Sequence, residues 1–346
     1  MRAAVIHQWN EPLVVEDVAD PAVPDDGVVI RILASGVCRS DWHAWVGHWP
    51  GIPRPHVLGH EMCGTIVAAG PRVRHFSEGD VVIPPFSGGC GVCQYCQRGQ
   101  QQVCEDDYQP GFYGWGSFAE YVAIPRADVN LVRLPEHLDP ATAAALGCRF
   151  MTSFHAVIDQ GRVRGGEWVA VHGCGGIGLS ATMIAKAVGA NVVAIDLDHR
   201  KLDAARVLGA DAVIDGRSVD DVAAAVRDVT GGGAHVSLDA VGAAAACRNS
   251  ILSLRRRGRH VQVGLLLADD LDVRVPFEEM IGWELEIIGS HGMQTHRYDD
   301  ALRMIAAGGM QPSTLIGDRI DLAEASDALA AMGRFEPLGF TVITSF

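Results

Sequence analysis

The sequence has little of what would tie a protein to a membrane or to nucleic acid. Only 28 Lys and Arg stand against 42 Asp and Glu, a net charge of −14, and no basic cluster exceeds the run Arg255–Arg257. No apolar run approaches the roughly 18 residues that cross a bilayer. His7 and Gln8 break the first apolar stretch too early for a signal peptide. We therefore expect no nucleic-acid partner, no membrane partner and a cytoplasmic location.

The cysteines do not follow the pattern of a disulfide framework. Their number, nine, is odd, and the chain of 346 residues is long for a small disulfide-rich domain. Four of them lie within fifteen residues, at Cys90, Cys93, Cys96 and Cys104. Clustered thiols in a reducing compartment favour metal binding over disulfides.

Length and patterning predict two domains in an α/β protein. Short β-like runs separated by turn signals fill the first ~130 residues, which is typical of an irregular antiparallel or barrel-like domain. From Glu167 onward, short apolar strands alternate with helices, and this alternation predicts a parallel sheet with helices on both faces. The chain then returns to a strand at Gly339–Ile343. We expect a β-rich domain at 1–150 and 287–346, interrupted by a doubly wound parallel-sheet domain at 151–286.

A glycine-rich turn follows the apolar run Trp168–His172. Its motif G-x-G-x-x-G is formed by Gly173, Gly175, Gly176, Ile177 and Gly178 around Cys174. In such a turn the first glycine allows the tight bend, the second lets the backbone approach a pyrophosphate, and the third lets helix pack on strand. The pattern alone also occurs in plain turns, but here a strand precedes it and a helix follows. It predicts a dinucleotide site.

An acid stands at the end of the next apolar run. Asp196 lies 18 residues after Gly178 (196 − 178), where a carboxylate accepts from the adenosine ribose hydroxyls and repels a 2′-phosphate. The pattern therefore favours NAD over NADP. Two alternatives stay open: Asp196 could cap the following helix, and Arg200 and Lys201 could soften the discrimination against NADP.

The four clustered cysteines have the spacing C-x2-C-x2-C-x7-C. Four thiolates complete a tetrahedral shell around Zn²⁺ and leave no position for a substrate, which is typical of a structural zinc site. An iron–sulfur cluster is the rival interpretation, because ferredoxin spacings are similar, but no Pro follows the last cysteine. We predict structural zinc.

Other metal-ligand types are scattered along the chain. A hydroxyl, an acid and an imidazole follow shortly after Cys38, His60 stands beside Glu61, and Cys148 precedes the second domain. Spacing alone does not unite them, because a lone buried cysteine is usually inert and a lone histidine is usually exposed or hydrogen bonded.

Taken together, these stretches resemble the zinc-dependent alcohol dehydrogenases of the medium-chain dehydrogenase/reductase superfamily. The resemblance spans both domains, and its matching stretches are Gly36–His43, Val57–Glu61, Cys90–Cys104, Gly147–Cys148, Gly173–Gly178 and Asp196. The run His43–Pro50 and the short interval between Cys104 and Gly116 resemble the yeast-type tetrameric branch. The resemblance implies a GroES-like catalytic domain interrupted by a Rossmann domain, two zinc ions per chain, NAD and a homotetramer.

The resemblance also implies a role for each matching residue. Cys38, His60 and Cys148 would hold a catalytic zinc, which Glu61 could also approach. The remaining implied roles are orientation of His60 by Asp41, proton transfer by Ser40 and His43, a pyrophosphate contact by Arg39 and a ribose contact by Lys201. The implied reaction is reversible hydride transfer between a small alcohol and its aldehyde or ketone, with zinc as Lewis acid.

Two features concern the ligands' surroundings. Trp45, Trp49 and Trp115 would line the substrate pocket and favour small or slender primary alcohols, although these rings could instead pack in the core or an interface.

Related chains often place an Arg after the glycine of the last strand, as a further pyrophosphate contact, where this chain has Phe340. We expect weaker NAD binding or faster NAD release as a result.

Other functions remain as alternatives. A zinc-dependent carbonyl reductase or a polyol-type dehydrogenase would share the fold, but polyol relatives often have Glu as third ligand where this chain has Cys148. A non-enzymatic redox or structural protein on the same fold is disfavoured by the intact set of ligand, relay and cofactor residues. NADH formation with a panel of alcohols, before and after chelation, separates these alternatives.

Overall fold

The computed structural model describes the backbone of residues 1–346 and every side chain except that of Asp269. The chain divides into two compact units, one of residues 1–151 and 292–346 and the other of residues 152–291. No helix among the described residues is long and apolar enough to span a membrane.

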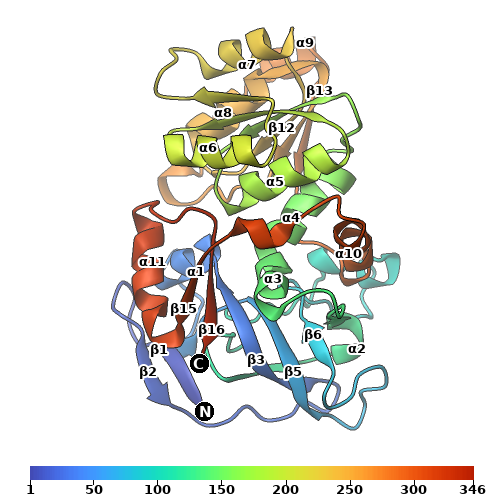
Figure 1. The fold of residues 1–346 in the computed structure, drawn as a ribbon, viewed down its shortest axis with the longest axis vertical. Helices are drawn as coiled ribbons and strands as arrows, with labels where there is room; N and C mark the ends of the chain where they lie inside the picture. Colours follow the sequence, from blue (N-terminus) through green and yellow to red (C-terminus); the bar gives the residue numbers. More distant parts are fainter. The chain divides into compact units, whose positions relative to one another are not determined.

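The first unit contains two β-sheets (Figure 1). A three-stranded sheet has the order β2-β1-β4, and a seven-stranded sheet has the order β15-β16-β3-β5-β6-β8 with β7 also paired to β3. The strands are β1 (Arg2–Ile6), β2 (Val14–Asp17), β3 (Val28–Val37), β4 (His56–Val57), β5 (Glu61–Ala69), β6 (Val81–Ile83), β7 (Tyr121–Ile124), β8 (Val132–Arg133), β15 (Ile316–Asp321) and β16 (Phe340–Ser345). β3 pairs antiparallel with β5, β7 and β16 and so carries the middle of the larger sheet.

Helices are short in this unit: α1 (Arg39–Trp45), α2 (Ala127–Asn130), α3 (Pro140–Ala145), α10 (Tyr298–Ala306) and α11 (Ala325–Gly333). α3 begins where the sequence predicts, because the Asp139 side chain accepts from the N–H groups of Ala141 and Thr142 and Pro140 takes the first helical position. The chain then widens into the π-helical turn η3 (Leu146–Phe150), which carries Cys148. Such turns recur at functional sites.

The second unit is one six-stranded sheet with the order β11-β10-β9-β12-β13-β14. Every pair in it is parallel. The strands are β9 (Trp168–His172), β10 (Asn191–Asp196), β11 (Ala212–Asp215), β12 (Ala234–Asp239), β13 (Leu254–Gln262) and β14 (Glu286–Gly289), and the helices are α4 (Met151–Phe154, entering from the first unit), α5 (Gly176–Ala187), α6 (His199–Val207), α7 (Val222–Thr230), α8 (Ala244–Leu252) and α9 (Phe277–Gly282). Figure 1 shows α5 and α6 on one side of the sheet and α7 on the other. The predicted doubly wound Rossmann-type sheet is confirmed.

The end of one helix and the end of the second unit differ from what the sequence indicates. The run Ala244–Leu254 by itself is typical of one helix, but α8 ends at Leu252, because Leu254 already pairs with Ala234 as the first residue of β13. The following unit boundary lies at Gly292, later than the expected residue 287, since β14 extends the parallel sheet beside β13. In both places strand pairing decides the outcome, and pairing across the sheet is invisible in local sequence.

Candidate metal centres and cofactor turn

Three ligand atoms from distant segments converge in the first unit. The sulfurs of Cys38 and Cys148 and a ring nitrogen of His60 all lie within 4.8 Å of one another, and all three residues are buried. Cys38 caps α1 at the end of β3, His60 immediately precedes β5, and Cys148 sits on the π-helical turn. The structure thus brings together the three residues that the sequence left scattered.

The histidine of this group is oriented for a metal. His60 Nδ1 lies 2.9 Å from Asp41 Oδ1, whose carboxylate also accepts from the N–H groups of Gly59 and Cys38. The other nitrogen, Nε2, is buried and has no hydrogen-bond partner. A buried polar atom left unpaired is costly, and a carboxylate that holds the far nitrogen is the usual support of a metal-bound imidazole. The orphaned nitrogen therefore fits a metal ligand.

The charges around the two thiols point the same way. The hydrogen bond shared with Cys148 lowers the pKa of Cys38, while the same bond and burial raise the pKa of Cys148. Burial alone would lower the pKa of His60. The Asp41 carboxylate raises it by more than burial lowers it, so the pKa of His60 lies above its ordinary value. Two buried sulfurs beside a buried imidazole form a ligand set for a divalent cation, and two Cys with one His leave a fourth position open around Zn²⁺.

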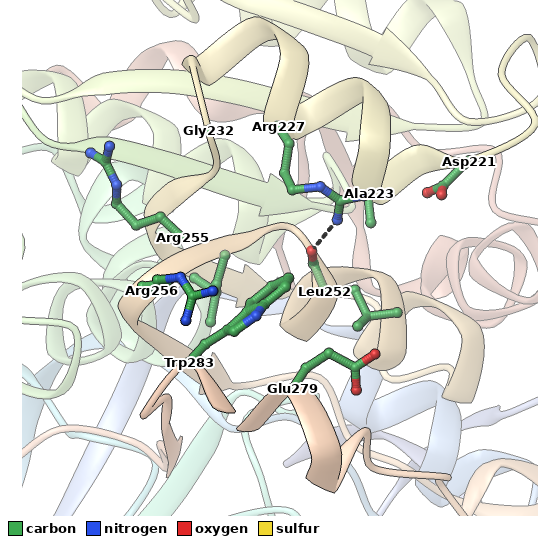
Figure 2. A pocket seen from close by; sticks show the side chains of 10 residues that line it. Asp221, Ala223, Arg227, Gly232, Leu252, Arg255, Arg256, Glu279 and Trp283 are labelled. Atoms are coloured by element: carbon green, nitrogen blue, oxygen red, sulfur yellow. Dashed lines mark hydrogen bonds between the residues drawn. The ribbon is translucent and has the colours of Figure 1, made fainter. Parts of the chain in front are cut away.

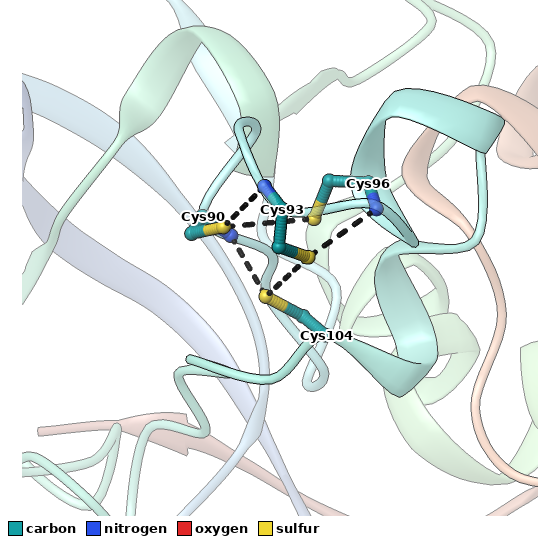
Figure 3. A group of neighbouring side chains, drawn as sticks. All are labelled: Cys90, Cys93, Cys96 and Cys104. Carbon is teal, nitrogen blue, oxygen red and sulfur yellow. Dashed lines mark hydrogen bonds between the residues drawn. The ribbon is translucent and has the colours of Figure 1, made fainter.

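The four clustered cysteines form a second group, whose ligand atoms also lie within 4.8 Å of one another (Figure 3). Cys90 Sγ lies 4.0 Å from Cys96 Sγ, and Cys93 Sγ lies 3.7 Å from Cys104 Sγ. A tetrahedron with Zn–S bonds of about 2.3 Å has sulfurs about 3.8 Å apart. The four sulfurs therefore already have the spacing of a closed zinc shell.

Backbone N–H groups stabilise the thiolates of this group. The N–H groups of Val92 and Cys93 point at Cys90 Sγ, at 3.4 and 3.3 Å, and that of Cys96 points at Cys93 Sγ at 3.5 Å. The backbone N–H groups of Cys96 and Glu105 lower the pKa of Cys93 to about 6. A thiolate near neutral pH is the form that binds zinc.

The two residues predicted to transfer protons, Ser40 and His43, lie on α1. Ser40 Oγ is 3.8 Å from Cys38 Sγ, and His43 follows three residues later on the same helix face. Burial, together with the charges of Arg39 and His48, lowers the pKa of His43 to about 4. His43 Nδ1 lies 2.8 Å from Nδ1 of the exposed His48. No motif in the sequence singles out His48, and its spacing of five residues from His43 is the one signal that points to it.

Aromatic rings surround the catalytic group, but only in part those that were expected. Trp49 packs edge-on against Phe112 at 5.1 Å, whereas Trp45 Nε1 donates to the Glu11 carbonyl and Trp115 is 38 % exposed. The rings nearest His60 are Phe112, at 5.3 Å, and Phe86, at 5.8 Å. Phe86 also packs in one apolar cluster with Cys38 and Cys148. No sequence signal singled out either phenylalanine.

Arg39, expected at the cofactor pyrophosphate, is held within the first unit. Its guanidinium lies 3.9 Å from the Trp42 ring and 4.1 Å from the Phe335 ring, and it donates to the Met332 carbonyl. Burial lowers its pKa to about 10. The side chain is therefore a fixed cation at the N-terminus of α1.

The glycine turn has the shape that a dinucleotide needs. It connects β9 to α5, which begins at Gly176, and the second position, Gly175, has no atom within 4 Å of where a Cβ would stand. A Cβ on Gly178 would lie 1.7 Å from the Gly173 carbonyl oxygen, so helix and turn touch there. The open space at Gly175 and the close packing at Gly178 match the glycine roles in dinucleotide binding.

Asp196 ends β10, as expected, and its carboxylate faces the turn. Oδ2 accepts from the Cys174 N–H at 2.6 Å, and Oδ1 accepts from the N–H groups of Leu197 and Asp198. Asp198, not Asp196, caps α6, since its side chain accepts from the Arg200 N–H. Lys201 lies in the first turn of α6. The alternative of Asp196 as helix cap is therefore wrong.

A separate cavity of about 460 Å³ lies elsewhere in the second unit (Figure 2). Its walls come from α7, β13 and α9 and include Arg227, Arg256 and Trp283. Arg227 Nη1 donates to the Leu252 carbonyl across it. None of the residues predicted for metal, cofactor or relay lines this cavity.

Comparison with known proteins adds independent findings. Residues 24–136 match the alcohol dehydrogenase GroES-like domain, and residues 176–307 match the zinc-binding dehydrogenase domain. The chain is 37 % identical over 329 residues to an alcohol dehydrogenase of Geobacillus stearothermophilus, covering 93 % of this chain and 95 % of that one. It is 33 % identical to a sorbitol dehydrogenase of Halalkalibacterium halodurans, with 92 % of each chain covered. The crystal structure of an NAD-dependent alcohol dehydrogenase is 30 % identical and matches with a TM-score of 0.91 over 100 % of both chains.

A Rossmann-type sheet with a glycine turn, joined in one chain to two thiolate metal groups, defines a zinc-binding oxidoreductase. The chain belongs to the zinc-dependent alcohol dehydrogenase family of the medium-chain dehydrogenase/reductase superfamily. The family that the sequence resembles is thus confirmed.

Proposed function

We propose that this chain oxidises small primary alcohols to aldehydes with NAD, reversibly. The observation that carries the proposal is the buried Cys38, His60 and Cys148 group with its unpartnered His60 Nε2. Zinc bound there would polarise the substrate oxygen and lower the pKa of the hydroxyl. Cys38, His60 and Cys148 would hold this ion, and Cys90, Cys93, Cys96 and Cys104 would hold the structural one. The thiolate ligands need reduced cysteines, which fits a cytoplasmic location.

The proton path of the proposal runs along α1. Ser40 takes the hydroxyl proton, because it stands beside the ligand Cys38, and His43 receives it. His43 is neutral at pH 7, so it can accept a proton, and the 2.8 Å contact with exposed His48 offers the exit to water. Such a path is needed because the reacting oxygen lies in a buried site and cannot reach bulk water directly.

The preference for NAD rests on the second unit. The Asp196 carboxylate at the glycine turn accepts ribose hydroxyls and repels a 2′-phosphate, while Gly175 leaves room for the pyrophosphate. Lys201, in the first turn of α6, contacts the adenosine ribose. The cofactor then supplies the hydride chemistry, and the protein supplies position and a dry site.

Small substrates are favoured by the rings around His60. Phe86 and Phe112 flank the ligand, and Trp49 packs on Phe112, so the immediate surroundings of the metal group are aromatic. A polyol would need hydrogen-bond partners for each further hydroxyl. This setting, together with a cysteine as third ligand, supports a simple alcohol over a polyol such as sorbitol.

We also propose a homotetramer of the yeast-type branch. β14 is an edge strand of the six-stranded sheet, and its Ile287 side chain is 41 % exposed. Phe277 and Ile281 on the preceding α9 are 60 % and 72 % exposed. An exposed apolar edge of this kind is normally covered by another chain, and sedimentation equilibrium measures the copy number.

The function is tested by NADH formation at 340 nm with a series of primary, secondary and polyhydric alcohols. We expect short primary alcohols to give the highest kcat/KM, NAD to be preferred over NADP, and dialysis against a chelator to abolish turnover until zinc is returned. Unchanged turnover in protein shown by metal analysis to be zinc-free would refute the proposal. A higher kcat/KM for polyols would overturn the substrate class only.

A further inference from the structure

Glu61 forms an ion pair with Arg149 beside the catalytic group. Glu61 is fully buried next to the ligand His60, yet it is not part of the group formed by Cys38, His60 and Cys148. Both of its oxygens are occupied by Arg149. Nε of Arg149 donates to Oε1 at 3.0 Å, and Nη2 donates to Oε2 at 2.5 Å. The carboxylate that was expected near the metal is therefore engaged in a bidentate ion pair.

The same carboxylate also holds the third ligand segment. Oε1 accepts from the backbone N–H of Arg149 at 2.9 Å and from that of Cys148 at 3.2 Å. The Tyr298 hydroxyl donates to the Gly147 carbonyl at 3.0 Å on the other side of the turn. Glu61, paired with Arg149, thus fixes the backbone that presents the Cys148 sulfur.

Arg149 is itself clamped in place. Its side chain is 6 % exposed, and its guanidinium lies 4.0 Å from the ring of Phe340, which is fully buried. Phe340 stands where sequence reasoning expected only the loss of a cofactor contact. In this chain the ring of Phe340 instead stacks against the Arg149 guanidinium and stabilises its charge through a cation–π contact.

Two glycines leave space for the ion pair. A Cβ on Gly36 would come within 2.3 Å of Glu61 Oε2 and 3.2 Å of Arg149 Nη2. A Cβ on Gly147 would come within 2.9 Å of the Glu61 Cα. A larger residue at Gly36 would displace the carboxylate, and one at Gly147 would displace the backbone of Glu61.

From this geometry we propose that Arg149 is a positioning residue that keeps Glu61 off the catalytic metal and so reserves the fourth coordination position for substrate. The proposal rests on the proposed function, since it presumes a metal in the Cys38, His60 and Cys148 group. Two thiolates balance a divalent ion, and Arg149 balances Glu61, so each set is neutral by itself. Without the guanidinium, the divalent cation would compensate the charge of the buried carboxylate, because backbone N–H groups alone carry no full charge.

The test replaces zinc in the catalytic group by Co²⁺, whose visible d–d bands report the number and kind of ligands on the ion. Arg149→Met removes the guanidinium and its charge and keeps an unbranched apolar stem. We expect the d–d bands to shift in position and intensity as the Glu61 carboxylate enters the coordination shell at the position otherwise open to water or substrate. The double variant Arg149→Met with Glu61→Gln is the matched control. Its buried pair is neutral, and its spectrum should return to that of the wild type.

Each outcome bears either on the role of Arg149 or on the proposed function. A spectrum of Arg149→Met equal to that of the wild type overturns the proposal, as does an altered spectrum that persists in the double variant. If Arg149→Met does not fold, Arg149→Lys takes its place, because one ammonium cannot engage both oxygens. We then expect a smaller shift in the same direction, and no shift overturns the proposal. A wild-type protein that binds no Co²⁺ in this group contradicts the proposed function instead.

Discussion

The two metal groups of the first unit are built in opposite ways. The four cysteines of the structural group lie between residues 90 and 104, whereas the catalytic ligands lie at 38, 60 and 148. In the structural group, local backbone N–H groups stabilise the sulfurs, as in the contacts to Cys90. In the catalytic group, buried carboxylates position the ligands. Asp41 holds the imidazole of His60, and Glu61 accepts from the backbone N–H of Cys148. One group is thus a local loop structure, and the other is a product of the whole domain.

The largest effect should separate the groups by activity. Cys148→Ser removes a catalytic ligand without touching the structural loop, so we expect kcat/KM to fall by about three orders of magnitude, the worth of several kcal/mol of Lewis-acid assistance. The thermal midpoint should stay near that of the wild type, and metal analysis should find one zinc per chain. Wild-type turnover in a Cys148→Ser protein with one zinc would contradict the assignment of the two groups.

The matched change in the other group should act on stability. Cys104→Ser opens the structural shell, and because loss of a metal-stabilised loop costs several kcal/mol, we expect the unfolding midpoint to fall by roughly 10 °C. Calorimetry measures this midpoint, and kcat at low temperature serves as the control, since the catalytic ligands are intact. A large loss of kcat with an unchanged midpoint would reverse the roles of the two groups.

Two buried histidines of the second unit, His172 and His260, belong to neither metal group and differ from His60 in their surroundings. His260 Nδ1 lies 3.0 Å from Ser250 Oγ, and His172 Nε2 lies 3.3 Å from Ser253 Oγ. Burial lowers the pKa of His172 to about 3 and that of His260 to about 4. Both fall below the unfolded value of about 6.5, so their contribution to stability is complete above pH 6.5 and is lost as the pH falls.

Urea unfolding of the zinc-loaded protein between pH 7 and pH 5 tests this expectation. The unfolding free energy should fall below pH 6.5 with a slope of up to about 1.4 kcal/mol per pH unit for each histidine. His172→Gln should show a shallower slope, because one group no longer titrates. An identical slope in the variant and the wild type would mean that His172 is not held neutral in the folded state.

The smallest effect concerns the exit of the proton path. His48→Gln leaves the ligands and His43 in place but removes the exposed imidazole, so we expect kcat to fall by about tenfold or less. Added imidazole buffer should restore part of the lost rate, and the zinc content should not change. A rate that is unaffected by both the substitution and the buffer would place the exit elsewhere.

Local chemistry made most of the elements predictable. The β-like runs Arg2–Ile6 and Trp168–His172 have the same bounds as β1 and β9, and the cap signal Asp139-Pro140 marks the start of α3. The glycine turn and the cysteine loop are also local, because their function depends on neighbours within a few residues. The start of β13 was missed, since Leu254 becomes a strand only through pairing with Ala234.

Local sequence accounts for the alternation of strands and helices, the tight turn at Gly173–Gly178 and the spacing of the four clustered sulfurs, because each depends on contacts within one short segment. Only the tertiary structure decided that Cys38, His60 and Cys148 meet, and that Glu61 pairs with Arg149 over the Phe340 ring. These contacts join β3, β5, β16 and the turn after α3, which are brought together by the burial of a common sheet. No local pattern of residues encodes such a meeting point, since its energy comes from long-range packing.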